Sequence, residues 1–149
     1  MRIKEHAPSP RFVESCIREG LSLDPGGASL TVSGTCMDPA LPAGCRIALR
    51  PPRGMPRVGE VVLLRIPAGL RLHRVLMRHR KSMWTKGDQG RYFDPRTTPD
   101  AVLAVWETNE PPWIRWRYVA FSVLRLFQRP WRSVVNVGHG EKPHVHTLP

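Results

Sequence analysis

Short apolar stretches recur along the middle of the chain, and each of them ends near a proline or a glycine. Apolar runs of this kind between turn residues are typical of β-strands. The pattern predicts strands over residues 28–32, 46–50, 60–66, 70–77, 82–86 and 101–106. The turn Pro67-Ala68-Gly69 separates two of these runs, which indicates a β-hairpin. With 16 prolines and 12 glycines in the chain, long helices are not expected.

Residues 1–25 are predicted to form a helical lead-in to the strands. Ser9 can cap a short helix, Pro10 can occupy its first position, and Gly20 is expected to end it. The residues predicted to share the inward face of this helix are Phe12, Val13, Cys16 and Ile17. Cys16 is therefore expected to be a contact of the core.

The segment after Pro112 differs in character, because residues 113–127 mix aromatic, aliphatic and arginine side chains. It is too short and too charged to span a bilayer, and we predict an amphipathic C-terminal helix over residues 111–130. Two roles are open for it: packing on the β domain, or lying on an anionic membrane surface through residues 113–132. Residues 131–149 have no periodicity and are expected to form a flexible tail.

The length of 149 residues is enough for one ordinary domain, and the hydrophobic share of 41% supports a packed core. We expect a mainly β domain over residues 26–110. Lys and Arg number 23 against 12 Asp and Glu, which gives a net charge of +11. This charge would suit a nucleic acid, but the strand arginines lack interleaved aromatic residues that stack on bases, so nucleic acid is not the expected partner. Anionic lipid or an acidic peptide leader fits the charge better.

Cysteine usage and the N-terminal residues bear on the compartment. The N-terminal residues contain no apolar stretch of the kind found in a secretory signal. The three cysteines Cys16, Cys36 and Cys45 are an odd number without a CxxC pair, which favours a reducing compartment. The prediction is a cytoplasmic protein, with peripheral attachment to a membrane as an option, and with no cofactor or metal. A disulfide between Cys36 and Cys45 is the alternative arrangement of the thiols.

Cys36 is the residue whose setting suggests chemistry. It lies between Gly34 and a Met-Asp-Pro turn after a predicted strand, so its thiol is expected to be exposed and held in place. A thiol nucleophile needs a base, and His73 within an apolar strand run is the best placed histidine. The imidazole needs an orienting acceptor, for which Asp88 and Asp94 are available downstream. Taken alone, one cysteine, one histidine and one aspartate in this order do not identify an active site, since buried structural cysteines are common.

Several short motifs around these residues occur in a fixed order. They are GTCMDPAL at residues 34–41, VGEVV at 58–62, HRV at 73–75, TKGD at 85–88, Asp94, and AVLAV at 101–105. The ordered set resembles the catalytic domain shared by signal peptidase I and the SOS-repressor autoproteases. The HRV motif is similar to that of the endoplasmic-reticulum and archaeal branch, in which histidine replaces the lysine base of the bacterial enzyme.

The chain departs from this family at identifiable positions. Cys36 stands where the family has its nucleophilic serine, and Cys45 replaces the aspartate that follows Gly44. Ala104 replaces a glycine of the last motif. A cysteine at the nucleophile position is chemically competent, because a thiol is more acidic and more nucleophilic than a hydroxyl. The fold implied by the resemblance is a distorted barrel of short antiparallel strands.

The resemblance also implies an endopeptidase that cleaves a peptide or preprotein bond. Cys36 would attack the scissile carbonyl, His73 would be the base, and Asp94 would hold the imidazole tautomer. Asp88 is expected to secure the loop, and backbone N–H groups near Cys36 would meet the oxyanion. The predicted nucleophile loop contains Ser33, Thr35 and Met37. The alternative is a catalytically silent peptide-binding module on the same fold.

Overall fold

A computed structural model describes residues 9–23 and 28–127 of the chain. In these residues the strands are β1 (Ala28–Thr31), β2 (Arg46–Arg50), β3 (Val61–Ile66), β4 (Gly69–His79), β5 (Ser82–Lys86) and β6 (Val102–Glu107). The helices are α1 (Pro10–Leu23) and α2 (Pro112–Phe127), with a 3₁₀ turn, η1 (Pro99–Ala101), before β6. All the predicted strands are confirmed, with bounds shifted by at most about two residues. The predicted tail over 131–149 and the outer parts of the lead-in, 1–8 and 24–25, lie outside the described residues.

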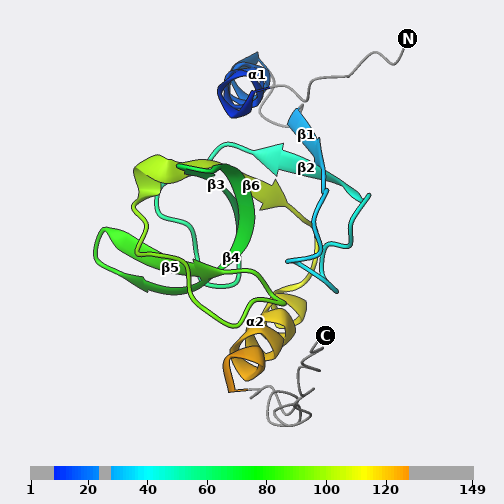
Figure 1. Cartoon of the computed structure of the whole chain (residues 1–149), viewed down its shortest axis with the longest axis vertical. Helices are drawn as coiled ribbons and strands as arrows, with labels where there is room; N and C mark the ends of the chain where they lie inside the picture. Colours follow the sequence, from blue (N-terminus) through cyan, green and yellow to red (C-terminus); the bar gives the residue numbers. More distant parts are fainter. Residues whose placement is uncertain (1–8, 24–27, 128–149) are drawn as a thin grey trace, which may run out of the picture.

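The strands form one antiparallel sheet in the order β1-β2-β6-β3-β4-β5. Figure 1 shows that this sheet curls strongly. Within the described residues β1 and β5 are not paired with one another, so the sheet remains open at both edges. The mainly β class is therefore confirmed, whereas closure of the strands into a barrel is not observed.

The first four residues of β3 are apolar without alternation because both faces of the strand are covered there. Val61 and Leu63 pack in a cluster that includes Ile17 of α1, while Val62 and Leu64 pack in a second cluster. Successive side chains of a strand point to opposite faces, so the two pairs belong to different layers of the core. The long strand β4, which carries the candidate base, is paired along this doubly buried strand.

The hairpin between β3 and β4 is confirmed. Ile66 pairs with Gly69, which leaves Pro67 and Ala68 as a two-residue turn. Gly69 has a φ of 126°, a value that L side chains rarely adopt, so the glycine suits the turn. The resulting register sets His73 opposite Val62, in the middle of the sheet.

Helix α1 differs from its prediction at its end and on its face. The Phe12 N–H donates to Ser9 Oγ at 3.3 Å, so Ser9 does cap the helix. The helix runs past Gly20 to Leu23, because Leu21 is buried and one further turn is stabilised by the core. Phe12 is exposed, and so is Cys16, so the prediction that Cys16 is a core contact is wrong.

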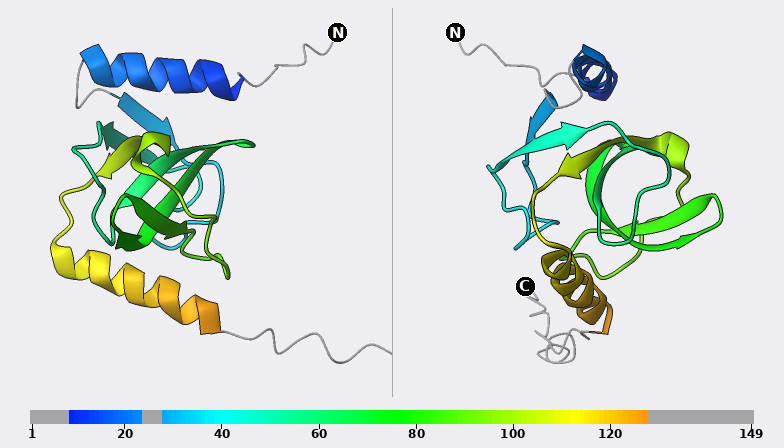
Figure 2. Two further views of the ribbon diagram at one scale, coloured as in Figure 1. Left: turned by 90° about the vertical axis from the view of Figure 1, so that its left-hand side faces the viewer. Right: turned by 180° about the vertical axis from the view of Figure 1, so that it is seen from behind.

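Helix α2 confirms the predicted C-terminal helix and packs against the opposite end of the sheet from α1 (Figure 2). Its contacts with the sheet include Tyr118, whose ring centre lies 5.0 Å from the guanidinium carbon of Arg74. Val119 and Ser122 are buried on the same side of the helix. No helix in the described part of the chain is long and apolar enough to cross a membrane.

Candidate active site

The loop between β1 and β2 holds Cys36 at the surface by burying its neighbours. Met37 is fully buried and Leu41 nearly so, and the Leu41 N–H donates to the Met37 carbonyl at 3.0 Å. These two apolar side chains anchor the loop in the core, whereas Cys36 is exposed. Ser33 and Thr35, which were also predicted for this loop, are exposed.

Cys36 and His73 meet at Gly87, although they come from separate parts of the chain. A Cβ added to Gly87 would lie 2.9 Å from His73 Nε2 and 3.2 Å from Cys36 Cβ. The Cys36 thiol donates a long hydrogen bond, 3.9 Å, to the carbonyl of Leu72, the residue before His73. The thiol and the imidazole therefore flank the same point, and only a residue without a side chain fits between them.

Asp94 orients the imidazole of His73 through a hydrogen bond with Nδ1, the ring nitrogen away from Cys36. His73 Nδ1 donates to Asp94 Oδ2 at 2.5 Å, and the hydroxyl of Thr85 donates to the same oxygen at 2.6 Å. The other carboxylate oxygen accepts from Arg71 at 2.9 Å. With Nδ1 bearing the hydrogen toward Asp94, Nε2 is the nitrogen left to accept a proton on the Cys36 side. The geometry is that of a cysteine, a histidine and an orienting aspartate in series.

The electrostatics of this cluster favour a basic imidazole. Burial disfavours the imidazolium, but the hydrogen bonds with Asp94 and with Cys36 outweigh it, so the pKa of His73 is raised above its usual value. Burial also opposes the charge on Asp94, but the hydrogen bonds from His73 and Thr85 outweigh it and lower the pKa of Asp94. Asp94 thus remains a carboxylate while His73 has an increased affinity for a proton.

Asp88 lies away from the imidazole and pairs with Arg74. Its two oxygens accept from Arg74 Nε and Nη2 at 2.8 Å and 2.7 Å, and both side chains are fully buried. Arg74 also donates to the carbonyl of Gly59 at 2.8 Å. Asp88 therefore ties the turn after β5 to β4 and to the turn before β3. Of the two aspartates considered from sequence, only Asp94 contacts His73 in the described residues.

Lys86 and Gln89 organise the turn that contains Gly87. The buried Lys86 Nζ donates to the carbonyls of Gly87 and Gly90, each at 2.7 Å, and burial lowers the pKa of this ammonium group. The Gln89 N–H donates to the carbonyl of Cys36 at 2.9 Å. These bonds attach the turn after β5 to the nucleophile loop and so hold Cys36 beside His73.

Arg71 and Thr85 were not identified as site residues from sequence. Arg71 precedes His73 by two positions on β4, so it shares a face of the sheet with the imidazole, and this alternation was a usable signal. Thr85 and Gly87 belong to the TKGD motif, but the sequence does not indicate that they contact Asp94 and Cys36.

The remaining thiols are not part of this cluster. All three cysteines are free, so the alternative disulfide between Cys36 and Cys45 is not formed. Cys45 is half-buried and packs against the core cluster. The described residues contain no group of three or more His, Cys, Asp and Glu side chains that could hold a metal ion.

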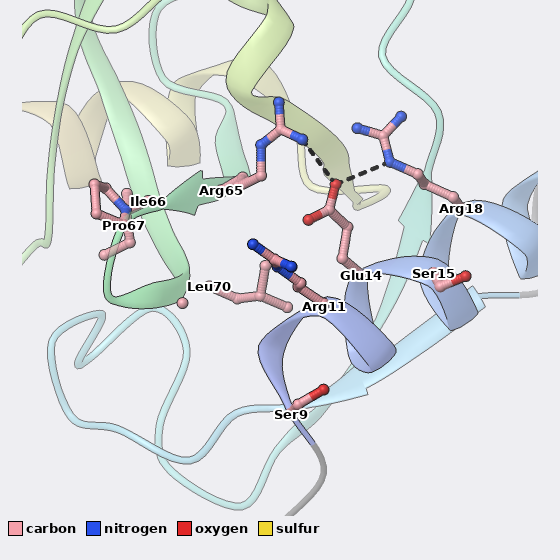
Figure 3. A pocket seen from close by; sticks show the side chains of 10 residues that line it. Ser9, Arg11, Glu14, Ser15, Arg18, Arg65, Ile66, Pro67 and Leu70 are labelled. Atoms are coloured by element: carbon pink, nitrogen blue, oxygen red, sulfur yellow. Dashed lines mark hydrogen bonds and ion pairs between the residues drawn. The ribbon is translucent and has the colours of Figure 1, made fainter.

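A cavity of about 950 Å³ lies elsewhere, between α1 and the β3–β4 hairpin (Figure 3). Within it the carboxylate of Glu14 accepts from both Arg18 and Arg65 at 3.1 Å. Arg11 also lines this cavity (Figure 3). Neither Cys36 nor His73 lines the cavity, so it is separate from the candidate active site.

Comparisons of the chain with family models, with curated proteins and with solved structures give no match.

Proposed function

We propose that the protein is an endopeptidase with a cysteine nucleophile and a signal-peptidase-like fold. The observation that supports this most strongly is the series Cys36, His73 and Asp94, with Nδ1 of His73 bonded to Asp94 and Nε2 turned toward Cys36. Such a series is the arrangement that activates a nucleophile in acyl transfer. We also propose that the fold is the distorted barrel implied by the resemblance. The curled, open sheet of six strands supports this part of the proposal.

Cleavage follows from the roles of these groups. His73 Nε2 accepts the thiol proton as Cys36 Sγ attacks the scissile carbonyl, and a tetrahedral intermediate forms. Collapse of the intermediate breaks the C–N bond, and the imidazolium returns the proton to the departing amine. The acyl group remains on sulfur as a thioester, which water hydrolyses with His73 again as the base. Asp94 keeps its charge throughout and stabilises the imidazolium.

The nucleophile loop offers donors for the oxyanion. Among the backbone hydrogen bonds of the described residues, the N–H groups of Cys36 and Met37 are not used, whereas that of Asp38 donates to the carbonyl of Thr35. Two free N–H groups at the nucleophile are a common way to stabilise the charge of a tetrahedral intermediate. The hydroxyls of Ser33 and Thr35 lie on the same loop and are exposed.

An extended peptide is the substrate that this site suits. Strand β1 is an edge strand of the sheet, paired only with β2 in the described residues, and the chain runs from it directly into the loop of Cys36. Edge strands bind extended peptides by adding them to the sheet. A peptide or preprotein segment paired along β1 would bring its scissile bond toward the thiol.

The test is cleavage of a mixture of synthetic peptides of defined sequence, read by mass spectrometry. The wild type is expected to cut a subset of them, while Cys36→Ala and His73→Ala should cut none and still fold. Cys16→Ala is the matched control, because Cys16 is also an exposed thiol and lies on α1, which contributes no residue to the series Cys36, His73 and Asp94. Retained cleavage in His73→Ala would contradict the assignment. Peptide binding without cleavage by the wild type would instead favour the silent peptide-binding module.

A further inference from the structure

Helix α2 presents a continuous apolar face that is not covered by the described part of the protein. After its first residue, Pro112, the exposed residues of the helix are Trp113, Trp116, Arg117, Ala120, Val123, Leu124 and Phe127. Because an α-helix turns about 100° per residue, these positions fall within an arc of about 120°. All of them except Arg117 are apolar, and Trp113, Trp116, Leu124 and Phe127 are each more than half exposed. An exposed stripe of this size marks an interaction surface.

The other face of α2 is held by the sheet, which determines the direction of the apolar stripe. Tyr118 lies over Arg74, and a Cβ added to Gly59 would touch Val119 at 3.5 Å. Arg125 is hydrogen-bonded to the side chain of Gln89, in the turn beside the candidate site. These contacts leave the helix no freedom to roll its exposed aromatic residues onto its own domain.

The charge around the stripe indicates which partner covers it. The helix contains three arginines and no aspartate or glutamate, and Arg117 lies 5.9 Å from the ring centre of Trp113. The whole chain has a net charge of +11. Two copies meeting through this face of α2 would bring together their Arg117 side chains and two strongly basic chains, which repel one another, whereas an anionic surface attracts them. Tryptophan with arginine on one helix is typical of the boundary between lipid headgroups and acyl chains.

We propose that the exposed face of α2 docks on the surface of a bilayer that contains anionic lipid. The apolar side chains enter the headgroup boundary, and Arg117, the exposed arginine of the stripe, pairs with lipid phosphate. The helix lies along the surface and does not cross it, in agreement with its length of 16 residues. Residues 128–132, which the sequence also assigns to this surface, lie outside the described residues. The proposal does not depend on peptidase activity.

The test is binding of the full chain to vesicles of phosphatidylcholine with and without phosphatidylglycerol, measured by co-sedimentation. Leu124→Glu is compared with Phe12→Glu, since both side chains are 62% exposed and both changes add one negative charge. We expect Leu124→Glu to weaken binding to the anionic vesicles at least about tenfold, and Phe12→Glu to weaken it less than about threefold. Leu124→Ser adds no charge, so its loss of binding to the anionic vesicles should lie between the losses of these two variants. Circular dichroism checks that each variant is folded.

Three outcomes distinguish lipid docking through α2 from peptidase activity, from a general attraction of charge and from dimer formation. Cys36→Ala should bind vesicles as the wild type does, so the result is independent of the proposed cleavage. Equal binding by Leu124→Glu and Phe12→Glu would overturn the proposal, because the attraction would then be a general effect of net charge. A wild-type dimer in sedimentation equilibrium that Leu124→Glu converts to a monomer, without vesicle binding, would overturn it in favour of a second copy.

Discussion

Asp88 and Asp94 each pair with an arginine of β4, yet the two pairs have different surroundings. The Arg74–Asp88 pair is buried, with side chains 1% and 0% exposed. In the Arg71–Asp94 pair the arginine is 39% exposed and the aspartate 11%. Among the described side chains, only Arg74 donates hydrogen bonds to the carboxylate of Asp88. The carboxylate of Asp94 accepts hydrogen bonds from His73 and Thr85 as well as from its arginine. The first pair joins parts of the fold, and the second orients an imidazole.

The difference arises from the alternation of side chains along β4. Arg71 and His73 are two residues apart and share one face of the strand, while Arg74 points to the other. An arginine–aspartate pair is therefore not by itself a sign of function. The informative feature is a third, titratable partner beside a reactive group that solvent can reach, which only Asp94 has.

The largest effect is expected for Asp94→Asn. The amide would favour the wrong imidazole tautomer, so the rate of peptide cleavage should fall by about 10³-fold or more. Because Arg71 reaches solvent, the free energy of unfolding should decrease by no more than about 2 kcal/mol. Cleavage kinetics and urea denaturation of the same preparation measure both quantities. Near-normal cleavage by this variant would remove Asp94 from the site.

Asp88→Asn should show the reverse pattern. The change leaves the guanidinium of Arg74 buried without its counter-charge, so the free energy of unfolding should fall by about 3–5 kcal/mol. The molecules that remain folded should keep Cys36 reactive, since Asp88 does not contact His73. Urea denaturation gives the stability, and the alkylation rate of the folded fraction gives the reactivity. A stable but unreactive Asp88→Asn would show that the two pairs have been assigned the wrong way round.

Gly87→Ala tests the contact between the nucleophile and the base. The new methyl would lie 2.8 Å from the Cys36 carbonyl oxygen and 2.9 Å from His73 Nε2, so the two segments must separate. A displacement of about 1 Å at a catalytic pair costs on the order of 10²-fold in rate. Gly34→Ala is the control, because a Cβ there meets no atom within 4 Å. Equal rates for the two variants would contradict the geometry described for Gly87.

Arg71→Gln is expected to have a small effect. An exposed ion pair contributes about 0–1 kcal/mol, so stability should change little and the cleavage rate by only a few-fold. Removing this cation strengthens the attraction of Asp94 for the imidazolium, so the acidic limb of the pH–rate profile should move to higher pH. A shift to lower pH would contradict the described charge arrangement.

The pH dependence of stability gives the smallest signal. The pKa of His73 is raised in the folded state above its ordinary 6.5, so its contribution to stability is fully present below that pH and is lost as pH rises through the folded pKa. The pKa of Asp94 is lowered, so its contribution is present above 3.8 and is lost as pH falls through the folded pKa. The stability of the wild type relative to His73→Gln should therefore decrease between mildly acidic and alkaline pH. Urea denaturation across this range checks the sign.

The strands and the hairpin could be predicted because their signals are local. Apolar runs between prolines and glycines predicted every strand, and the turn at Pro67 and Ala68 set the register of β4. The end of α1 could not be predicted, because burial of Leu21 outweighs the tendency of Gly20 to end a helix. The exposure of Cys16 follows from the way the helix rolls on the sheet, which spacing alone does not specify.

The residues of the candidate site could be predicted from the sequence, but the contacts that hold them together could not. Cys36 and His73 could be selected by chemistry, but Asp94 could be separated from Asp88 only by the family resemblance, without a contact to support it. The roles of Lys86 and Gly87 depend on contacts between the turn after β5 and the loop after β1, segments far apart in the chain. Such contacts are long-range and leave no periodic trace in the sequence.

The most direct test of the central claim is the alkylation rate of Cys36 by iodoacetamide as a function of pH. Mass spectrometry of the digested protein reports Cys36 and Cys16 separately, so the exposed thiol on α1 is an internal standard. In the wild type we expect Cys36 to react at least about tenfold faster than Cys16, since Nε2 of His73 can accept the thiol proton as the sulfur attacks. In His73→Gln this advantage should vanish. Equal rates at the two thiols in the wild type, or an advantage that survives in His73→Gln, would contradict the account.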